Sequence, residues 1–227
     1  MTFTRYALYF APPTEADWTQ WASAWLGWDM ETGQPLAHPN CDLDVAAITD
    51  TPRKYGLHAT LKPPMRLAEG QSEAALRDAC ARFAATQPAL RLEGLELARL
   101  GRFLALRTIG DEHALNQLAA ACVEALDGFR APLSDAELTR RRGNGLSAAQ
   151  EANLTQWGYP HVMELFRFHI TLSGKLDKAT AAATESFLSD VLVPQLPKPF
   201  EIKDLALVGE RADGRFELIQ RYPLSSG

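Results

Sequence analysis

The sequence has few cysteines and no long apolar run. Its three cysteines, Cys41, Cys80 and Cys122, are widely spaced, and no two of them form a C-x-x-C pair. An odd number of such cysteines indicates neither a disulfide framework nor a zinc knuckle. No segment approaches the roughly 18 consecutive apolar residues that a membrane-spanning helix needs, and the first residues lack the apolar core of a signal peptide. We therefore expect a cytoplasmic protein with no membrane partner.

Positive charge is also scarce. The 227 residues include 23 Lys and Arg against 28 Asp and Glu, which gives a formal net charge of −5. Broad non-specific binding to nucleic acid requires many cations that displace counterions, so an extended nucleic-acid footprint is not expected. A short or small anionic substrate in a locally basic cleft stays compatible with this charge. The 46% apolar content is enough to bury a substantial core.

Two common hydrolase motifs are missing from the sequence, and a repeated motif stands in their place. There is no G-x-S-x-G nucleophile elbow and no H-E-x-x-H zinc motif. The chain instead contains H-x-T-L twice, at 58–61 and 169–172. Two such matches would arise by chance roughly once in a thousand sequences of this composition. The repeated pair is therefore the strongest functional signal in the sequence.

The first motif opens a series of predicted elements. A strand at 56–62 contains the motif and is expected to end at Pro63-Pro64. Ser72 is the expected N-cap of a helix that continues to about Thr86. An alternating segment from Leu90 follows, with one extra residue near Gly94 that suggests a bulge, and it predicts a hairpin that turns at 101–102.

The same series recurs downstream, which indicates an internal duplication. A motif strand at 168–172 is followed by a helix from Asp177 to about Val193 and by a hairpin that turns at 213–214. The motif histidines are 111 residues apart, and the alternating segments begin 110 residues apart. A period of this length is too long for a solenoid. We predict one bilobal domain over 1–227, in which the motif copy at 55–109 forms the first lobe and the motif copy at 166–222 forms the second.

Between the copies lies a helical connection with a basic insert, over 111–160. Two capping-box signatures predict two short helices there, one starting at Ser134 and Glu137 and the other at Ser147 and Gln150. The loop between them, Arg140 to Gly145, is basic and contains glycine.

Each motif strand brings a set of polar side chains to one face, because alternate residues of a strand point the same way. The sets are His58, Thr60 and Lys62 in the first copy, and Arg167, His169 and Thr171 in the second. Imidazole can act as acid or base near neutral pH. A threonine hydroxyl can donate to a phosphate oxygen as negative charge grows. The pattern predicts phosphodiester chemistry with one imidazole on each side of the phosphorus, and either histidine could be the base.

Other interpretations of these residues stay open. Zinc is an alternative partner of paired histidines, but H-x-T supplies only one ligand per strand. Several cations could contact substrate anions or could form an ordinary solvated surface. They are Lys62, Arg167, Lys175 and the cluster from Arg140 to Arg142.

The two motifs resemble those of the 2H phosphoesterase superfamily, which is named for two H-x-[ST]-hydrophobic signatures. The strings at 5–13, 55–64, 157–160 and 166–169 are similar to a bacterial branch that is associated with phosphonate metabolism. The resemblance implies a duplicated, two-lobed α+β fold of the LigT type, with antiparallel sheets lining a central cleft and helices outside. It also implies action on a cyclic phosphate or a 2′-5′ phosphodiester without metal or cofactor.

The resemblance further implies a role for each site residue. His58 and His169 would be the acid/base pair, and Thr60 and Thr171 would hold the phosphate; Lys62, Arg167 and Tyr55 are added as substrate-binding candidates. Two alternatives remain: a non-catalytic protein that binds a nucleotide or sugar phosphate, and an RNA end-processing or ligase-like enzyme whose partner is an RNA end.

Overall fold

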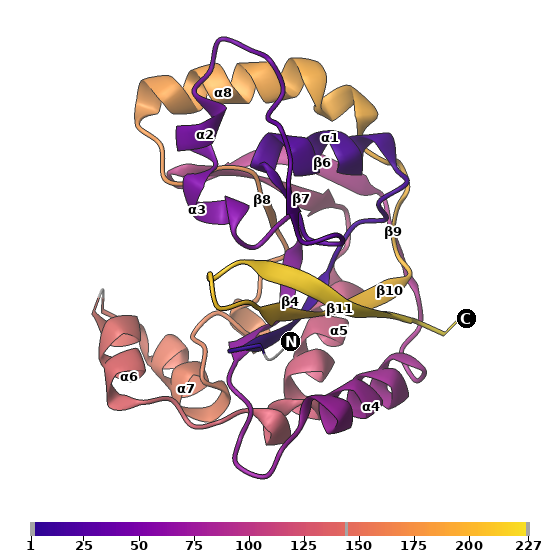
Figure 1. Cartoon of the computed structure of the whole chain (residues 1–227), viewed down its shortest axis with the longest axis vertical. Coiled ribbons are helices and arrows are strands. Elements are labelled where there is room, and N and C mark those ends of the chain that lie inside the picture. The colour runs from indigo at the N-terminus through magenta and orange to yellow at the C-terminus, as the bar shows by residue number, and fades with distance from the viewer. Residues whose placement is uncertain (1–2, 144, 226–227) are drawn as a thin grey trace.

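The computed structural model describes residues 3–143 and 145–225, and its two larger antiparallel sheets have helices on their outer sides (Figure 1). The larger sheet has the order β11-β10-β1-β4. Its strands are β1 (Tyr6–Phe10), β4 (Ala59–Met65), β10 (Asp204–Glu210) and β11 (Phe216–Pro223). The smaller sheet consists of β6 (Gly94–Leu100), β7 (Phe103–Ile109) and β8 (Ile170–Thr171), in that order.

The longer helices cover the outer faces of these sheets. Helices α4 (Glu73–Ala84) and α5 (His113–Ala125) pack on the larger sheet. Helix α8 (Lys178–Val191) packs on the smaller sheet and lies beside α1 (Asp17–Leu26). The prediction of an α+β fold with antiparallel sheets and outer helices is confirmed. Among the described residues, no helix combines the length and the apolar character needed to cross a bilayer.

The remaining elements lie outside these two sheets and their covering helices. The helices are α2 (Val45–Ile48), α3 (Asp50–Arg53), α6 (Asp135–Arg142) and α7 (Ala148–Trp157), with single 3-10 turns at Asp127–Phe129, Met163–Leu165 and Val193–Gln195. The strands are β2 (Trp28–Asp29), β3 (Gln34–Pro35), β5 (Leu90–Leu92) and β9 (Phe200–Ile202).

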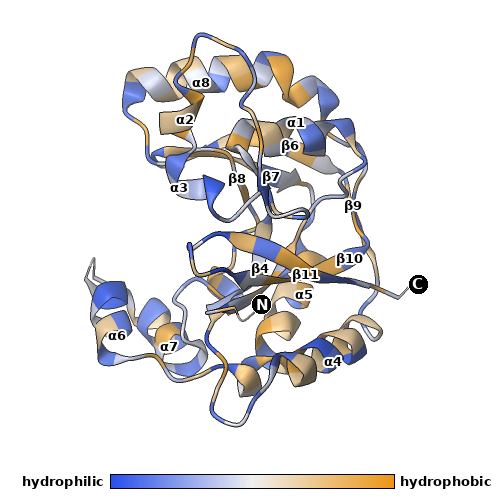
Figure 2. Ribbon diagram, in the orientation of Figure 1, coloured by the Kyte–Doolittle hydropathy of each residue, from blue (hydrophilic) through white to orange (hydrophobic). Residues whose placement is uncertain are grey.

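Local sequence signals set the ends and the buried faces of α4 and α8. The Ser72 hydroxyl accepts from the Ala75 amide at 3.1 Å, and the Asp177 carboxylate accepts from the Ala179 amide at 2.9 Å, as the capping signals predicted. Both helices carry apolar and polar residues side by side (Figure 2). The apolar side of α4 includes Cys80, which is fully buried and whose pKa burial raises to about 12. Cys80 is thus a small residue of the core.

Strand pairing differs from the prediction that each motif copy forms its own lobe. The hairpin β6-β7, from the first copy, pairs with β8 of the second copy. The hairpin β10-β11, from the second copy, joins β1 and so the motif strand β4 of the first copy. The two copies have therefore exchanged hairpins. The repeat in the sequence shows which elements exist, but strand partners are a long-range property that the repeat pattern does not contain.

The exchange of hairpins is centred on a two-stranded sheet that β5 and β9 form with each other. These strands occupy equivalent places in the two copies, and they pair antiparallel with Arg91 opposite Glu201 and with Leu90 opposite Ile202. Equivalent segments that pair antiparallel with each other are related by a local twofold axis. This arrangement also corrects the predicted bulge near Gly94, because the extra residue separates β5 from β6, which belong to different sheets.

The first motif strand has the predicted length but lies three residues further along the chain, at Ala59–Met65 instead of 56–62. Pro63 and Pro64 were expected to end it, but β4 continues through them to Met65. β4 is an edge strand, where proline does not have to donate to a further neighbour. The pairing with β1 is irregular around these prolines, between Lys62 and Met65.

The basic insert folds as the capping signals predicted. α6 and α7 begin at Ser134 and Ser147, and each has a complete capping box with Glu137 or Gln150. Asn144, in the loop between the helices, lies outside the described residues.

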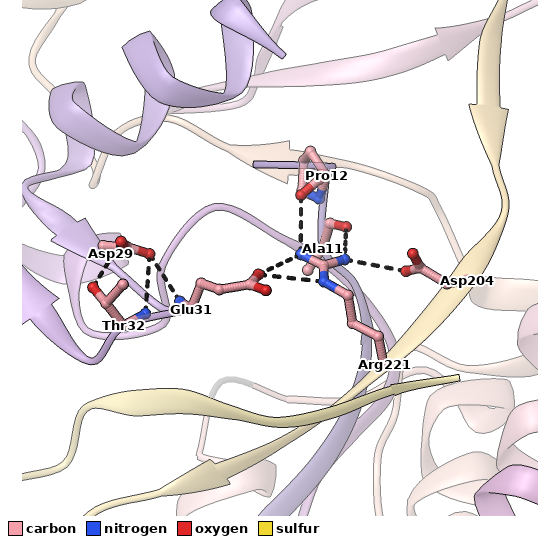
Figure 3. Close-up of polar contacts among 7 residues, drawn as sticks. All are labelled: Ala11, Pro12, Asp29, Glu31, Thr32, Asp204 and Arg221. Carbon is pink, nitrogen blue, oxygen red and sulfur yellow. Dashed lines mark hydrogen bonds and ion pairs between the residues drawn. The ribbon is translucent and has the colours of Figure 1, made fainter. Parts of the chain in front are cut away.

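A half-buried arginine ties the larger sheet to the turn that follows β2 (Figure 3). The Arg221 guanidinium donates to Glu31 at 2.7 Å, to Asp204 at 3.1 Å, and to the carbonyls of Ala11 and Pro12 at 2.8 and 3.2 Å. Replacement by methionine keeps the aliphatic stem but removes all four contacts. We expect Arg221→Met to lower the free energy of unfolding by about 1–3 kcal/mol, measured by urea denaturation.

The matched control for this prediction is Arg99→Met, because Arg99 makes a more exposed ion pair with Glu185. Exposed pairs contribute about 0–1 kcal/mol. Equal losses in the two variants would contradict the role given to Arg221.

Candidate functional site

Each motif histidine lies immediately before its strand and is held by the backbone. The His58 Nδ1 lies 2.9 Å from the Gly56 carbonyl, and the His169 Nδ1 lies 2.8 Å from the Arg167 carbonyl. A carbonyl oxygen only accepts, so Nδ1 carries the proton in both rings and Nε2 is left for chemistry. Gly56 has a φ of 70°, and a Cβ there would lie 2.7 Å from the Cβ of Met30, so the turn requires glycine.

The His58 ring is enclosed by its neighbours. It stacks on Tyr9, with centroids 3.9 Å apart, and its Nε2 lies 3.2 Å from the Thr60 hydroxyl. Burial lowers the pKa of His58 to about 4; the positive charge of His169 acts in the same direction, and the hydrogen bond to Gly56 opposes both. His58 is therefore neutral at pH 7, and its Nε2 can accept a hydrogen bond from the Thr60 hydroxyl.

The second histidine, like the first, is half-buried, and it is near enough for its charge to act on His58. His169 is not among the described residues that line the cleft, but its ring centroid lies 6.0 Å from that of Phe103. Phe103 and His58 line the same cleft. The folded chain therefore brings the two motifs, 111 residues apart in sequence, into one region.

The cleft is formed by both sheets and by the insert. Its volume is about 600 Å³, within the size range of small-molecule sites. Thr60 from β4 and Thr171 from β8 both line it, together with Tyr55, whose ring is 5.9 Å from that of His58. The predicted central cleft and the convergence of both threonines on it are thus observed.

The cleft is strongly basic although the chain is acidic. Its lining includes five cationic residues, Arg5, Lys54, Arg140, Arg141 and Lys175, and no Asp or Glu among the residues that the structure describes. Arg5 is neutralised by Glu210 at 2.5 Å. For Lys175, Arg140 and Arg141 the sequence left open substrate contact or an ordinary solvated surface, and the structure places all three in the cleft wall.

Lys62, in contrast, does not line the cleft with His58 and Thr60. Its side chain is buried, and its Nζ donates to the Val123 carbonyl at 2.9 Å, at the end of α5. The cause is a bulge in β4: Thr60 pairs with Tyr9 and Lys62 pairs with Leu8, so two steps along β4 match one along β1. The alternation that placed Lys62 on the motif face is broken there. We correct its predicted role from substrate binding to support of the fold.

Two other predicted cations also point elsewhere. The Arg167 guanidinium folds back onto the carbonyls of Glu164 and Phe166, and it is not among the described residues that line the cleft. Arg142, the third arginine of the insert, pairs with Glu151 of α7 at 2.5 Å on the exposed surface.

Sequence reasoning missed several residues of the cleft wall. Tyr9, Phe103 and Tyr159 line it, beside Arg5 and Lys54. Tyr9 and Phe103 lie in apolar strands, where an aromatic residue is typical of a core. The only signal available for Arg5, Tyr9 and Tyr159 was that they fall within the strings that resemble the phosphonate-associated branch.

The zinc alternative gains no support from the arrangement of ligands. Among residues 3–143 and 145–225, no three His, Cys, Asp or Glu side chains are grouped in a way that could hold a metal ion.

Solved structures of low sequence identity align with nearly the whole chain. LigT of E. coli in complex with 3′-AMP covers 99% of this chain and 100% of its own, with 18% identity and a TM-score of 0.47. TT0787 of Thermus thermophilus covers 98% of both chains, with 16% identity and a TM-score of 0.47.

Curated relatives are more similar in sequence but much longer. A protein named ribose 1,5-bisphosphate phosphokinase PhnN, from Janthinobacterium sp. (strain Marseille), is 38% identical over 99% of this chain. A protein of the same name from Laribacter hongkongensis (strain HLHK9) is 41% identical over 77%. The alignments cover 51% and 41% of these relatives, so the chain spans about half the length of the curated relatives it matches.

A protein-family comparison covers most of the chain. The family described as "Protein of unknown function (DUF1045)" matches residues 60–217, which include Thr60 and the whole second motif. This is more than half of the 227 residues. The chain belongs to the DUF1045 family.

Proposed function

We propose that the protein is a phosphoesterase that cleaves a small cyclic phosphate, or a nucleotide or sugar phosphodiester, by two-histidine acid/base catalysis without a metal ion. One observation carries the proposal: the two H-x-T-L motifs meet at a single basic cleft, with Thr60 and Thr171 in its wall beside His58. The resemblance to 2H phosphoesterases agrees with this chemistry. That resemblance also leads us to propose phosphonate metabolism as the pathway.

The two imidazoles have different environments, which suggests different roles. His58 is neutral at pH 7 and has an unprotonated Nε2, so it can act as the base. A residue with so low a pKa cannot supply a proton at neutral pH. We therefore assign the acid role to His169, which acts in its protonated form.

For hydrolysis of a cyclic phosphate, the steps are as follows. The His58 Nε2 removes a proton from water while the water oxygen bonds to phosphorus. The ring P–O bond breaks on the opposite side, and His169 gives its Nε2 proton to the leaving oxygen. Thr60 and Thr171 donate to the non-bridging oxygens as their negative charge increases.

This role of the threonines gives a prediction. We expect Thr60→Val and Thr171→Val each to lower kcat by about tenfold, because a hydrogen bond to a developing charge is lost. Thr60→Ser and Thr171→Ser keep the hydroxyl and should retain most of the activity. Equal kcat in the valine and serine variants, measured at saturating substrate, would exclude this role.

The test of the proposal is a substrate panel assayed with EDTA present. It contains 2′,3′-cyclic nucleotides and cyclic phosphates of ribose; the sugar compounds are included because the curated relatives carry a ribose phosphate name. We expect turnover in EDTA by the wild type and none by His58→Ala/His169→Ala. Activity that survives in the double variant, or that requires added metal, would refute the proposal. Tight binding without turnover across the panel would favour the non-catalytic alternative.

A further inference from the structure

The charge of the cleft exceeds what a single phosphodiester needs. A phosphodiester carries one negative charge. Of the five cations in the wall, only Arg5 has an ion-pair partner among the described residues, so Lys54, Arg140, Arg141 and Lys175 are not neutralised by the protein. The proposed reaction itself uses imidazole and hydroxyl groups. The cations therefore point to a substrate with additional negative charge.

Arg141 is the most informative of these residues. Its side chain is half-buried in the cleft wall, and its guanidinium lies over the Tyr159 ring, 4.9 Å from the centroid. Its Nε is buried without a hydrogen-bond partner among the described residues. An arginine nitrogen that is removed from water without a partner is costly, and an anionic ligand would satisfy it.

Neighbouring carboxylates do not take this role. Glu137, one turn earlier on α6, is held by Arg66 at 2.9 Å and by the Ser134 amide at 2.8 Å. Glu151 is held by Arg142 on the outer surface. Two adjacent arginines thus diverge: Arg142 is paired away from the cleft, and Arg141 enters its wall.

We propose that Arg140 and Arg141, together with Tyr159, form a subsite for a second phosphate of the substrate, a phosphomonoester distant from the reacting phosphodiester. This inference rests on the proposed function and narrows its substrate class to small molecules that carry both groups. A phosphomonoester has a charge of about −1.5 to −2 at pH 7 and three acceptor oxygens, which suit two guanidinium groups and a phenol. A planar carboxylate can be satisfied by one guanidinium.

The experiment compares two substrates that differ only in the second phosphate. Adenosine 2′,3′-cyclic phosphate is assayed with and without a 5′-phosphate. For the wild type we expect kcat/KM to be at least about tenfold higher with the 5′-phosphate. Arg141→Gln should abolish this preference but keep the activity on the substrate without the 5′-phosphate. Arg142→Gln, the same change at the adjacent position, should keep the preference, and Arg141→Lys should restore part of it.

The outcomes separate this inference from the proposed function. Turnover of both substrates with equal kcat/KM, or a preference unaffected by Arg141→Gln, overturns the second subsite and leaves the phosphoesterase proposal intact. If neither substrate is turned over, binding decides: calorimetry with adenosine 3′,5′-bisphosphate and with 3′-AMP should show that Arg141→Gln weakens only the bisphosphate. Equal affinities in that variant and the wild type overturn the subsite. Melting curves of each variant confirm that α6 and α7 remain folded.

Discussion

Replacement of His58 by asparagine is expected to lower kcat/KM by about 10²- to 10⁴-fold, the usual contribution of a general base. Asparagine can still hydrogen-bond near the Gly56 carbonyl, but it cannot accept a proton from water. His169→Asn should cause a loss of similar size because the leaving oxygen is no longer protonated. His113→Asn is the matched control, since His113 is exposed at the start of α5, and it should leave the kinetics unchanged.

Leaving-group dependence distinguishes the two roles. In a phosphodiester with a nitrophenol leaving group, the leaving oxygen needs little protonation. The general acid, His169, is therefore not needed for this substrate. We expect this substrate to recover most of the activity of His169→Asn and little of that of His58→Asn. Recovery of the His58 variant instead would mean that the roles are reversed.

The pH profile provides an independent test of His58 as the base. The logarithm of kcat/KM reports the titration of groups in the free enzyme. Because the pKa of His58 is lowered to about 4, the acidic limb should fall near pH 4 instead of near 6.5. An acidic limb at 6 or above would show that His58 does not act as this base.

The chemistry of the site was more accessible from the sequence than its architecture. His58, Thr60 and Thr171 were found because a short motif occurs twice, and a motif is a local feature. The exchange of hairpins could not be found in this way. The alternation of polar and apolar residues in β6-β7 is equally satisfied by pairing with β4 or with β8, and only the packing of the whole chain decides between them.

Lys62 illustrates a different limit of prediction from the sequence. Its position in the motif strand predicted the same face as Thr60, and this holds for a regular strand. The bulge that turns Lys62 inward depends on the pairing of β4 with β1, and no glycine marks it in the sequence. The cations that do line the cleft come from segments outside the motifs, mainly the insert and the turn before His58.

The buried position of Lys62 has a measurable consequence for stability. Burial lowers the pKa of its ammonium to about 8, and repulsion by Arg130 adds to this effect, whereas attraction by Asp127 opposes it. Asp127 cannot compensate fully, since it is held at 2.7 Å by Arg130 and lies 3.5 Å from Lys62. The folded protein therefore binds the Lys62 proton less tightly than the unfolded chain does.

The sign of the pH dependence follows from this difference. Below pH 8 Lys62 is protonated in both states, and the full cost of burying its charge opposes folding. Between pH 8 and the ordinary value of 10.5, only the unfolded chain holds the proton, so folding becomes more favourable as the pH rises. Above 10.5 the amine is neutral in both states. A difference of 2.5 between the two pKa values corresponds to at most about 3 kcal/mol.

Comparison with Lys62→Met isolates this group from every other titration in the same range. We expect the free energy of unfolding of the wild type, minus that of Lys62→Met, to increase by up to about 3 kcal/mol between pH 8 and 10.5, measured by urea denaturation. A flat difference for Lys62→Met would contradict the lowered pKa of the buried ammonium.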